Sequence, residues 1–391
     1  MRLTTSEAGD LSRLRQLNER AVLAAARSAG ELRVAQIVAQ SGLGRTAVED
    51  VLTSLVARGW LVEESPAIRG RGRPARSYRF RAEAGYVVGL DIGAYSVRGV
   101  LTDLSCRVLA EGRRSVTPQA RRRTRLAAAD QVIADCARDA GVPAEDIWAV
   151  GCGTTGLVDA AGTVVRANAI PDWSGLNLAA HFRRPASRLV AVDNDSQLAA
   201  LAEHRLGSTT PTGETDLVFL HAGLRTGLAL ILDGRLRRGA HGAAADMSTL
   251  PTVAWEPAIE HLHGVVPADV PLADRAEQAF AAARAGHRAA RAAVRRYARA
   301  MAIAAATAIS VVDPRVLVLG GAFSQAADVL MDPLAAELAR ISPRVPELHA
   351  SSLGAQCVVL GAACLALDAV DERLLASGPL PRLAATSLST T

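Results

Sequence analysis

The spacing of apolar residues changes near Phe80, and this change constrains the fold more than any other feature of the chain. Before it, apolar residues recur every three or four positions, which predicts helices over residues 14–27, 34–40 and 45–58. After it, apolar runs such as 85–93 end in Asp and Gly, which predicts buried strands. Because 391 residues exceed one ordinary core, we expect two or three domains.

Residues 14–58 have the pattern of a helix-turn-helix. Two short helical stretches flank a break at residues 41–43, and Gly59 ends the second stretch. Residues 60–63 then read as a strand that enters a β-wing, although a three-helix bundle that binds another protein is the alternative. Base edges are met by the N-terminal end of a recognition helix. The candidates for DNA contact are therefore Arg45, Thr46 and Glu49.

Arginine alternates with glycine in residues 69–76, directly before a strand-like stretch at 77–80. An extended Arg-Gly segment is slim enough to enter a minor groove, whose negative potential attracts arginine. A solvated flexible linker has a similar composition and is the alternative. We expect a wing tip that contacts DNA through Arg69, Arg71 and Arg73.

The net positive charge of the chain lies in the same region. Residues 1–82 hold 14 Arg and 8 Asp or Glu, a balance of +6, whereas the remainder holds 30 Arg (44 − 14) and 31 acidic residues (39 − 8), a balance of −1. Binding of basic residues to phosphates releases condensed counterions. The distribution therefore predicts double-stranded DNA as a partner, and a two-fold symmetric dimer would require an inverted-repeat operator.

Several classes of protein are disfavoured by the composition. No run of about 18 uncharged apolar residues occurs, so we expect no membrane span. Residues 1–10 lack the apolar core of a secretory signal, which predicts a cytoplasmic location. The five cysteines are scattered without a C-x-x-C pair, which argues against a disulfide framework and a thiolate zinc site. We expect neither a metal nor a cofactor.

The order of motifs resembles the ROK family of repressors, open reading frames and kinases, in particular its sugar-responsive regulators. These motifs are the helix-turn-helix, GRGRP, LDIG, VDND and RRGAHGAA, and the resemblance covers residues 11–367. It implies an α/β fold with an N-terminal winged helix-turn-helix and a two-lobed actin-like ATPase domain, a sugar site between the lobes, and a homodimer or homotetramer. The expected domains are residues 1–82, lobe 1 at 83–195 and lobe 2 at 196–391, with the last helix returning to lobe 1.

The resemblance also implies a set of ligand-binding residues. Asn194 matches an Asn that binds sugar hydroxyls, and Asp195 matches the catalytic base of active kinases, although an Asx cap on the following helix is the alternative for this pair. Asp246 stands where the family has the Glu of E-x-G-H. The loop at 151–158 resembles G-x-x-x-P-G-x-V, with Thr155 in place of Pro. The remaining expected ligand contacts are Gly153, Gly156 and Asn168.

Departures from the kinase motifs predict that this chain is not an enzyme. Arg225 replaces a glycine in the phosphate loop, and Tyr95 adds bulk to the first loop, where backbone must approach phosphate closely. Thr249 replaces a zinc-ligating His, and no cysteine follows at 250–264.

The sequence thus predicts a DNA-binding regulator, of the repressor type, for carbohydrate-related genes. We expect a sugar or sugar-derivative effector to control it. Two alternatives stay open: an active sugar kinase that carries a DNA-binding domain, and a ligand-independent regulator that uses the second domain for oligomerisation.

Overall fold

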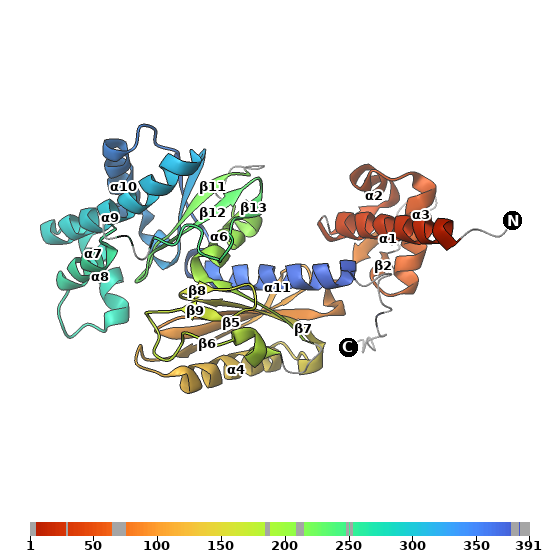
Figure 1. Ribbon diagram of the computed structural model, residues 1–391, viewed down its shortest axis with the longest axis horizontal. Helices are drawn as coiled ribbons and strands as arrows, with labels where there is room; N and C mark the ends of the chain where they lie inside the picture. Colours follow the sequence, from red (N-terminus) through yellow and green to blue (C-terminus); the bar gives the residue numbers. More distant parts are fainter. Residues whose placement is uncertain are drawn as a thin grey trace, which may run out of the picture. The chain divides into compact units, whose positions relative to one another are not determined.

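The computed structural model describes residues 5–28, 30–64, 76–183, 188–208, 215–247, 250, 253–376 and 383 (Figure 1). These residues form two compact units. The smaller unit comprises Met1–Tyr86, Thr102–Arg107 and Leu367–Thr391, and the larger comprises Val87–Leu101 and Val108–Ala366. The first boundary lies four residues beyond the expected end of the DNA-binding domain. The expected division at residue 195 falls inside the larger unit and stays a prediction.

In the described residues up to Phe80, the smaller unit contains three α-helices and a three-stranded antiparallel sheet in the order β1-β3-β2. These elements are consistent with the expected winged helix-turn-helix, which stays a prediction. Its elements are α1 (Thr5–Ser28), β1 (Glu31–Arg33), α2 (Val34–Ser41), α3 (Arg45–Ala57), β2 (Leu61–Glu64), β3 (Ser77–Phe80) and the 3-10 helix η1 (Ala82–Ala84).

Local sequence explains where these elements begin and end. Gly42 ends α2 in the left-handed region at φ 69°, and its N–H donates to the carbonyl of Val38. Val48, Val51, Leu52 and Leu55 are spaced along one face of α3, and this face is buried. Residues 65–75, where the wing tip is expected, lie outside the described residues, and with them the expected DNA contacts Arg69, Arg71 and Arg73.

Ion pairs also stabilise the smaller unit. Glu19 on α1 is 3% exposed and lies 2.6 Å from Nη2 of Arg58, at the end of α3. Arg27 lies 2.5 Å from Asp371, on the final part of α11 (Cys357–Ala376), and its guanidinium stands 5.8 Å from the centre of the Phe80 ring. The C-terminal part of α11 is thereby a component of the smaller unit.

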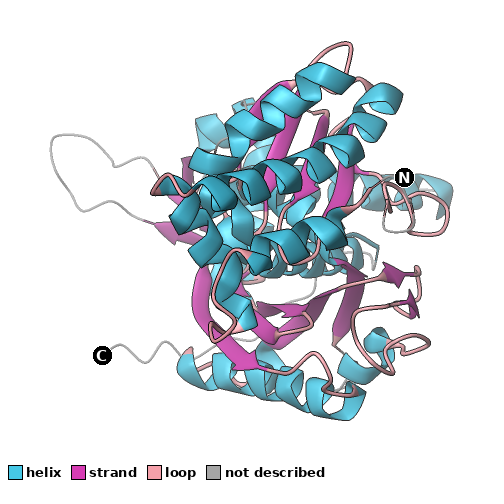
Figure 2. Ribbon diagram, turned by 90° about the vertical axis from the view of Figure 1, so that its left-hand side faces the viewer, coloured by secondary structure: helices cyan, strands magenta, loops and turns pink. Residues whose placement is uncertain are grey.

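The larger unit contains two five-stranded sheets, with helices outside both of them (Figure 2). The first sheet has the order β10-β7-β4-β5-β6, and the second has the order β13-β12-β11-β14-β15. The predicted α/β class is confirmed. The elements of the first half are β4 (Tyr86–Ile92), β5 (Ser96–Asp103), β6 (Val108–Ser115), α4 (Arg122–Asp139), η2 (Ala144–Asp146), β7 (Ile147–Thr154), β8 (Leu157–Val158), β9 (Val164–Arg166), α5 (Leu178–Phe182), β10 (Leu189–Asn194) and α6 (Asp195–Leu206).

The second sheet carries most of the remaining helices on one side. The core here is rich in alanine, because α9 packs closely against α7, α8 and α10 through small side chains. The elements are β11 (Leu217–His221), β12 (Gly227–Leu232), β13 (Arg235–Leu236), α7 (Trp255–Gly264), α8 (Leu272–Arg284), α9 (Arg288–Val312), β14 (Val316–Gly320), η3 (Ala322–Ala326), α10 (Ala327–Ile341), β15 (Glu347–Ala350), η4 (Gly354–Gln356) and α11.

The first half of α11 packs directly on the strands of the first sheet. A Cβ atom at Gly89 on β4 would lie 2.2 Å from the carbonyl oxygen of Val359, and one at Gly151 on β7 would lie 1.8 Å from that of Ala362. Glycine is required at both positions because the backbones approach so closely. Among the described residues, 354–374 alone are long and apolar enough to cross a bilayer, but 61% of the apolar window is buried inside the protein, as in a core helix.

Candidate ligand-binding site

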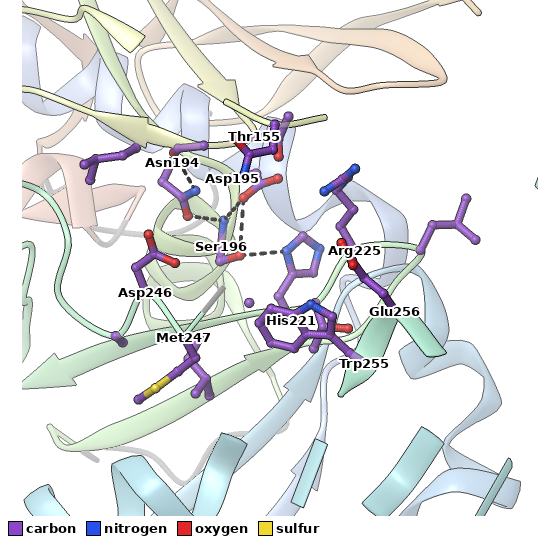
Figure 3. Close-up of a pocket in the computed structure, with 18 of the residues that line it drawn as sticks. Thr155, Asn194, Asp195, Ser196, His221, Arg225, Asp246, Met247, Trp255 and Glu256 are labelled. Carbon is purple, nitrogen blue, oxygen red and sulfur yellow. Dashed lines mark hydrogen bonds between the residues drawn. The ribbon is translucent and has the colours of Figure 1, made fainter. Parts of the chain in front are cut away.

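A pocket of about 500 Å³ lies in the larger unit, where the ends of β7 and β10 face the turns of the second sheet (Figure 3). Most of the expected ligand residues line it. Gly153 does not, since it is buried on β7, and a Cβ there would lie 2.7 Å from Val358. The lining residues that the sequence singled out are Tyr95, Gly156, Asn168, Asn194, Asp195, Arg225 and Asp246.

The sequence left two alternatives for Asn194, a ligand contact and a cap on the following helix, and the structure places the side chain where it caps the helix and lines the pocket. Its Oδ1 accepts hydrogen bonds from the backbone N–H groups of Ser196 (2.9 Å) and Gln197 (3.3 Å), so that it caps α6. Its Nδ2 donates to the carbonyl of Gly156 at 2.9 Å. The side chain therefore fixes the loop after β7 against the start of α6, while it still lines the pocket.

Asp195 begins α6, where the helix dipole favours a negative charge. Its Oδ1 accepts from the backbone N–H of Ser196 at 2.7 Å and from the Ser196 hydroxyl at 3.3 Å. That hydroxyl also lies 3.2 Å from Nδ1 of His221, as the row of dashed lines in Figure 3 shows. Burial lowers the pKa of His221, so its imidazole is neutral near pH 7. Sequence analysis did not single out His221.

A second carboxylate stands near Asp195. This carboxylate is Asp91, near the end of β4. Three effects act on its pKa: burial and the charge of Asp195 raise it, and the charge of Arg98, the weakest of the three, lowers it. Desolvation and the negative charge of Asp195 raise the pKa of Asp91 to about 7. Asp91 therefore changes its charge near neutral pH.

Asp246 reaches the pocket on the loop 237–247, which follows β13. Its Oδ2 lies 3.2 Å from Nη2 of Arg166, the last residue of β9. The same loop is held at two further points, by the 2.5 Å contact of Arg238 with the buried Asp193 and by the bond that Gln197 donates to the carbonyl of Gly242 (3.0 Å). These contacts hold the loop of Asp246 against β9, β10 and α6.

Tyr95 belongs to the loop at residues 93–96, which the family resemblance likens to a phosphate loop. A buried arginine holds the backbone of this loop. Arg125 of α4 is 0% exposed and donates to the carbonyls of Gly93, Ala94, Thr117 and Ala120. The loop before Tyr95 thus has a defined backbone, and Tyr95 itself lines the pocket.

The second loop, at residues 222–227, carries an arginine where the resemblance places a glycine. Arg225 is exposed at the pocket, and a Cβ at Gly321 would lie 2.4 Å from Cδ2 of His221. The imidazole of His221 therefore fills the space between this loop and the glycine turn after β14.

The remaining wall of the pocket comes from α7 and α8. The first of these helices lies in the part of the chain, residues 250–264, where the family's metal ligands were expected to be absent. Among the residues that the structure describes, no three His, Cys, Asp or Glu side chains come together in a way that could hold a metal ion, and Thr249 lies outside the described residues. The side chains that α7 and α8 contribute are Trp255, Glu256, Ile259, Glu260, His263 and Leu272, and Leu224 and Met247 line the pocket from two loops.

The candidate DNA contacts Arg45, Thr46 and Glu49 lie together on the first turns of α3, and all three are exposed. Arg45 donates from Nε to Glu49 at 2.9 Å, one helical turn away. Such an exposed pair contributes little to stability, so the guanidinium can exchange this partner for a base edge or a phosphate.

Comparison with known proteins agrees with this architecture. The model of the ROK family matches residues 87–258 and 250–369. The xylose repressor of Caldicellulosiruptor bescii is 23% identical over 206 residues, which are 52% of this chain and 51% of the repressor. The chain thus spans about half the length of this curated relative.

Two solved structures share the fold. A ROK family transcriptional regulator, a homologue of the Escherichia coli MLC protein, has a TM-score of 0.72 at 21% identity and covers 93% of this chain and 98% of its own. A ROK family glucokinase from Streptomyces griseus, solved with glucose and AMPPNP, has a TM-score of 0.61 at 25% identity and covers 73% and 100%. These likenesses confirm the predicted two-lobed, actin-like architecture.

Proposed function

We propose, from the premise that the chain belongs to the ROK family, that it is a DNA-binding transcription regulator whose pocket binds a sugar without phosphorylating it. The observation that carries this proposal is the composition of the pocket. Hydrogen-bonding groups for a sugar are present, whereas Arg225 stands where the kinases that this chain resembles have a glycine that lets backbone approach phosphate. A regulator of this type would act in the cytoplasm, as a repressor of carbohydrate-related genes.

DNA binding is supported by the smaller unit. Its helices and sheet have the order of a winged helix, and the first turns of α3 expose Arg45, Thr46 and Glu49. The balance of +6 over residues 1–82 provides attraction to phosphates. We propose that α3 binds in the major groove, that the Arg-Gly segment contacts the minor groove, and that a homodimer or homotetramer binds an inverted repeat.

Sugar binding is supported by the polar end of the pocket. The carboxylates of Asp195 and Asp246 are acceptors for sugar hydroxyls, and the exposed amide of Asn168 offers both a donor and an acceptor. Asn194 and Gly156 hold the shape of this end. A hydroxyl bound by Asp246 would compete with Arg166 for the carboxylate and so alter the attachment of the 237–247 loop. Such a change affects DNA binding if the ligand prefers one conformation.

An active kinase is the second candidate, because Asp195 is present and the glucokinase shares the fold. Against it stand the bulk of Arg225 and Tyr95 at the pocket and the packing of His221 on Gly321. A coupled assay for ADP release in the presence of ATP and a sugar panel decides between the two. Turnover that disappears in Asp195→Asn would establish the kinase.

The DNA-binding proposal is tested with operators selected from random duplexes by the full-length protein. At fixed salt, we expect Arg45→Ala to weaken operator binding about 5–150-fold, since one good base contact contributes about 1–3 kcal/mol. Arg299→Ala, at an exposed arginine of α9, serves as the charge-matched control and should bind normally. A sugar of the panel should release the operator. If no sugar has any effect, the ligand-independent alternative is correct.

A further inference from the structure

The pocket has two chemically different ends. Asn194 and Asp195 lie in the upper part of the view in Figure 3, whereas Met247 and Trp255 lie below them, and Asp246 lies between Asn194 and Met247. The second end forms an apolar flank, which we define by five side chains. They are Leu224, Met247, Trp255, Ile259 and Leu272.

The apolar flank keeps surface available to a ligand. Leu224, Met247, Trp255 and Ile259 pack with one side on the core of the second sheet and its helices, but each is only partly buried. Leu272, at the start of α8, is 42% exposed. Apolar side chains that line a concave pocket gain free energy when a ligand removes them from water. A sugar hydroxyl would gain little from this surface, since its one strong hydrogen-bonding group is the indole N–H of Trp255.

The charge of the pocket disfavours an anionic ligand. Its lining includes four carboxylates and two guanidinium groups, a balance of −2 (2 − 4). Burial lowers the pKa of both lining histidines, His221 and His263, so neither adds a positive charge near pH 7. Arg166 is paired with Asp246, which leaves Arg225 as the guanidinium without an ion pair among the described lining residues. A phosphate or carboxylate would therefore meet a negative field.

The pocket is large enough to hold a sugar ring together with a second group. About 500 Å³ lies within the roughly 300–1,000 Å³ of pockets that enclose drug-sized ligands. A ring bound between Asn168, Asn194, Asp195 and Asp246 leaves the apolar flank uncovered.

We propose that the effector is a neutral glycoside, with its sugar ring at the polar end and an apolar aglycone, aryl or alkyl, on the apolar flank. The aglycone would lie against Trp255 and Met247 and cover Leu272, whereas its sugar would bind Asp195 and Asp246. This inference rests on the proposed function, because the polar end is the same sugar site.

The test compares matched ligands on the full-length protein by calorimetry. The probes are the methyl and 4-nitrophenyl glycosides of glucose, galactose, mannose, xylose and N-acetylglucosamine, together with glucose 6-phosphate and cellobiose. We expect at least one sugar to bind about tenfold more tightly as its nitrophenyl glycoside, a difference of about 1.4 kcal/mol. Trp255→Ala should remove this gain, so that the methyl and nitrophenyl glycosides of that sugar bind within about twofold of one another. Leu272→Asp, at an exposed position that should not disturb folding, should do the same.

Two further variants complete the design. Asp246→Asn should weaken the methyl and nitrophenyl forms equally, because both place a sugar at the polar end. Val311→Ala, at a residue of α9 that is 81% exposed and outside the pocket lining, should change neither affinity.

The inference is overturned if methyl and nitrophenyl glycosides bind equally, if none of the probes binds, or if glucose 6-phosphate or cellobiose binds most tightly. It is also overturned if Trp255→Ala and Leu272→Asp both keep the nitrophenyl gain. Its failure can be told apart from that of the proposed function. Methyl glycosides that release DNA without any nitrophenyl gain contradict the ligand class alone. A nitrophenyl gain without any change in DNA binding contradicts the regulator alone.

Discussion

Replacement of Gly151 by alanine tests the packing on which the larger unit depends. The new Cβ atom would lie 1.8 Å from the carbonyl oxygen of Ala362, 2.7 Å from its carbon and 3.2 Å from the backbone nitrogen of Ala366. Contacts of a Cβ under 3.0 Å are essentially never seen, so α11 must move away from β7 by more than 1 Å (3.0 − 1.8). None of these three atoms can rotate away, because all of them belong to the backbone of a helix.

The size of the effect follows from this displacement. Overpacking in a well-packed core costs about 1–3 kcal/mol and sometimes more, and a shift of a whole helix belongs at the upper end, about 3 kcal/mol. For a unit of this size, each kcal/mol lowers the unfolding temperature by about 2–4 °C, so we expect Gly151→Ala to lower it by about 6–12 °C.

Thermal unfolding of the full-length protein, followed by circular dichroism, measures this shift. Gly264→Ala is the matched control, because a Cβ there meets no atom within 4 Å and the residue does not have a positive φ. That variant should unfold at the wild-type temperature or slightly above it. An unfolding temperature of Gly151→Ala within 2 °C of wild type would show that α11 does not lie on β7 as described.

Three further predictions concern charge. Asp91 has a pKa of about 7 in the folded protein against 3.8 in the unfolded chain, so the folded state binds more protons between these values and loses stability from Asp91 as pH rises from about 4 to 7. Asp91→Asn should therefore unfold at a higher temperature than wild type at pH 8, with no difference near pH 4. Glu19→Gln removes the buried negative charge that faces Arg58 and should cost about 3–5 kcal/mol in chemical unfolding. Arg45→Ala should keep the wild-type stability and lose operator affinity, because its ion pair with Glu49 is exposed.

Controls and contradicting outcomes for these predictions are simple. An Asp91→Asn difference that is the same at pH 4 and pH 8 would show that the carboxyl has an ordinary pKa. Glu347→Gln removes an exposed partner of Arg315 and should cost under about 1 kcal/mol, so an equal loss in Glu19→Gln would refute the buried pair. Loss of stability in Arg45→Ala would mean that α3 needs this side chain for folding.

Local patterns predicted the helices and strands well where they carry their own signals. The apolar stripe and the bounding glycines predicted α2 as 34–40 and α3 as 45–58, and these helices span Val34–Ser41 and Arg45–Ala57. The first helix begins at Thr5 rather than Leu14, because a helix can extend beyond its apolar stripe over residues of adequate propensity.

The pocket was predicted less completely, because its contacts join residues far apart in the chain. Asn194, Asp195 and Asp246 were found through motif resemblance, but the pairing of Asp246 with Arg166 spans 80 positions and no local pattern reveals it. His221 looked like the end of an apolar strand. Its place beside Gly321 depends on the pairing of β11 with β14, which only the fold determines.

The apolar flank was missed for a different reason. The motif resemblance bears on residues 250–264 only through the absent metal ligands, so it gives no sign of Trp255 and Ile259 as ligand contacts. Their spacing of four positions places both on one face of α7, and this signal was available in the sequence.

The central claim is that one ligand site and one DNA site are coupled, and a reciprocal binding measurement tests it most directly. The affinity of the tightest probe glycoside is measured by calorimetry for the free protein and for its complex with a selected operator. Because coupling between two binding sites is symmetric, an effector that releases DNA must bind the complex about 5–150-fold more weakly, which corresponds to about 1–3 kcal/mol. Equal affinities for the free protein and the complex would contradict the account.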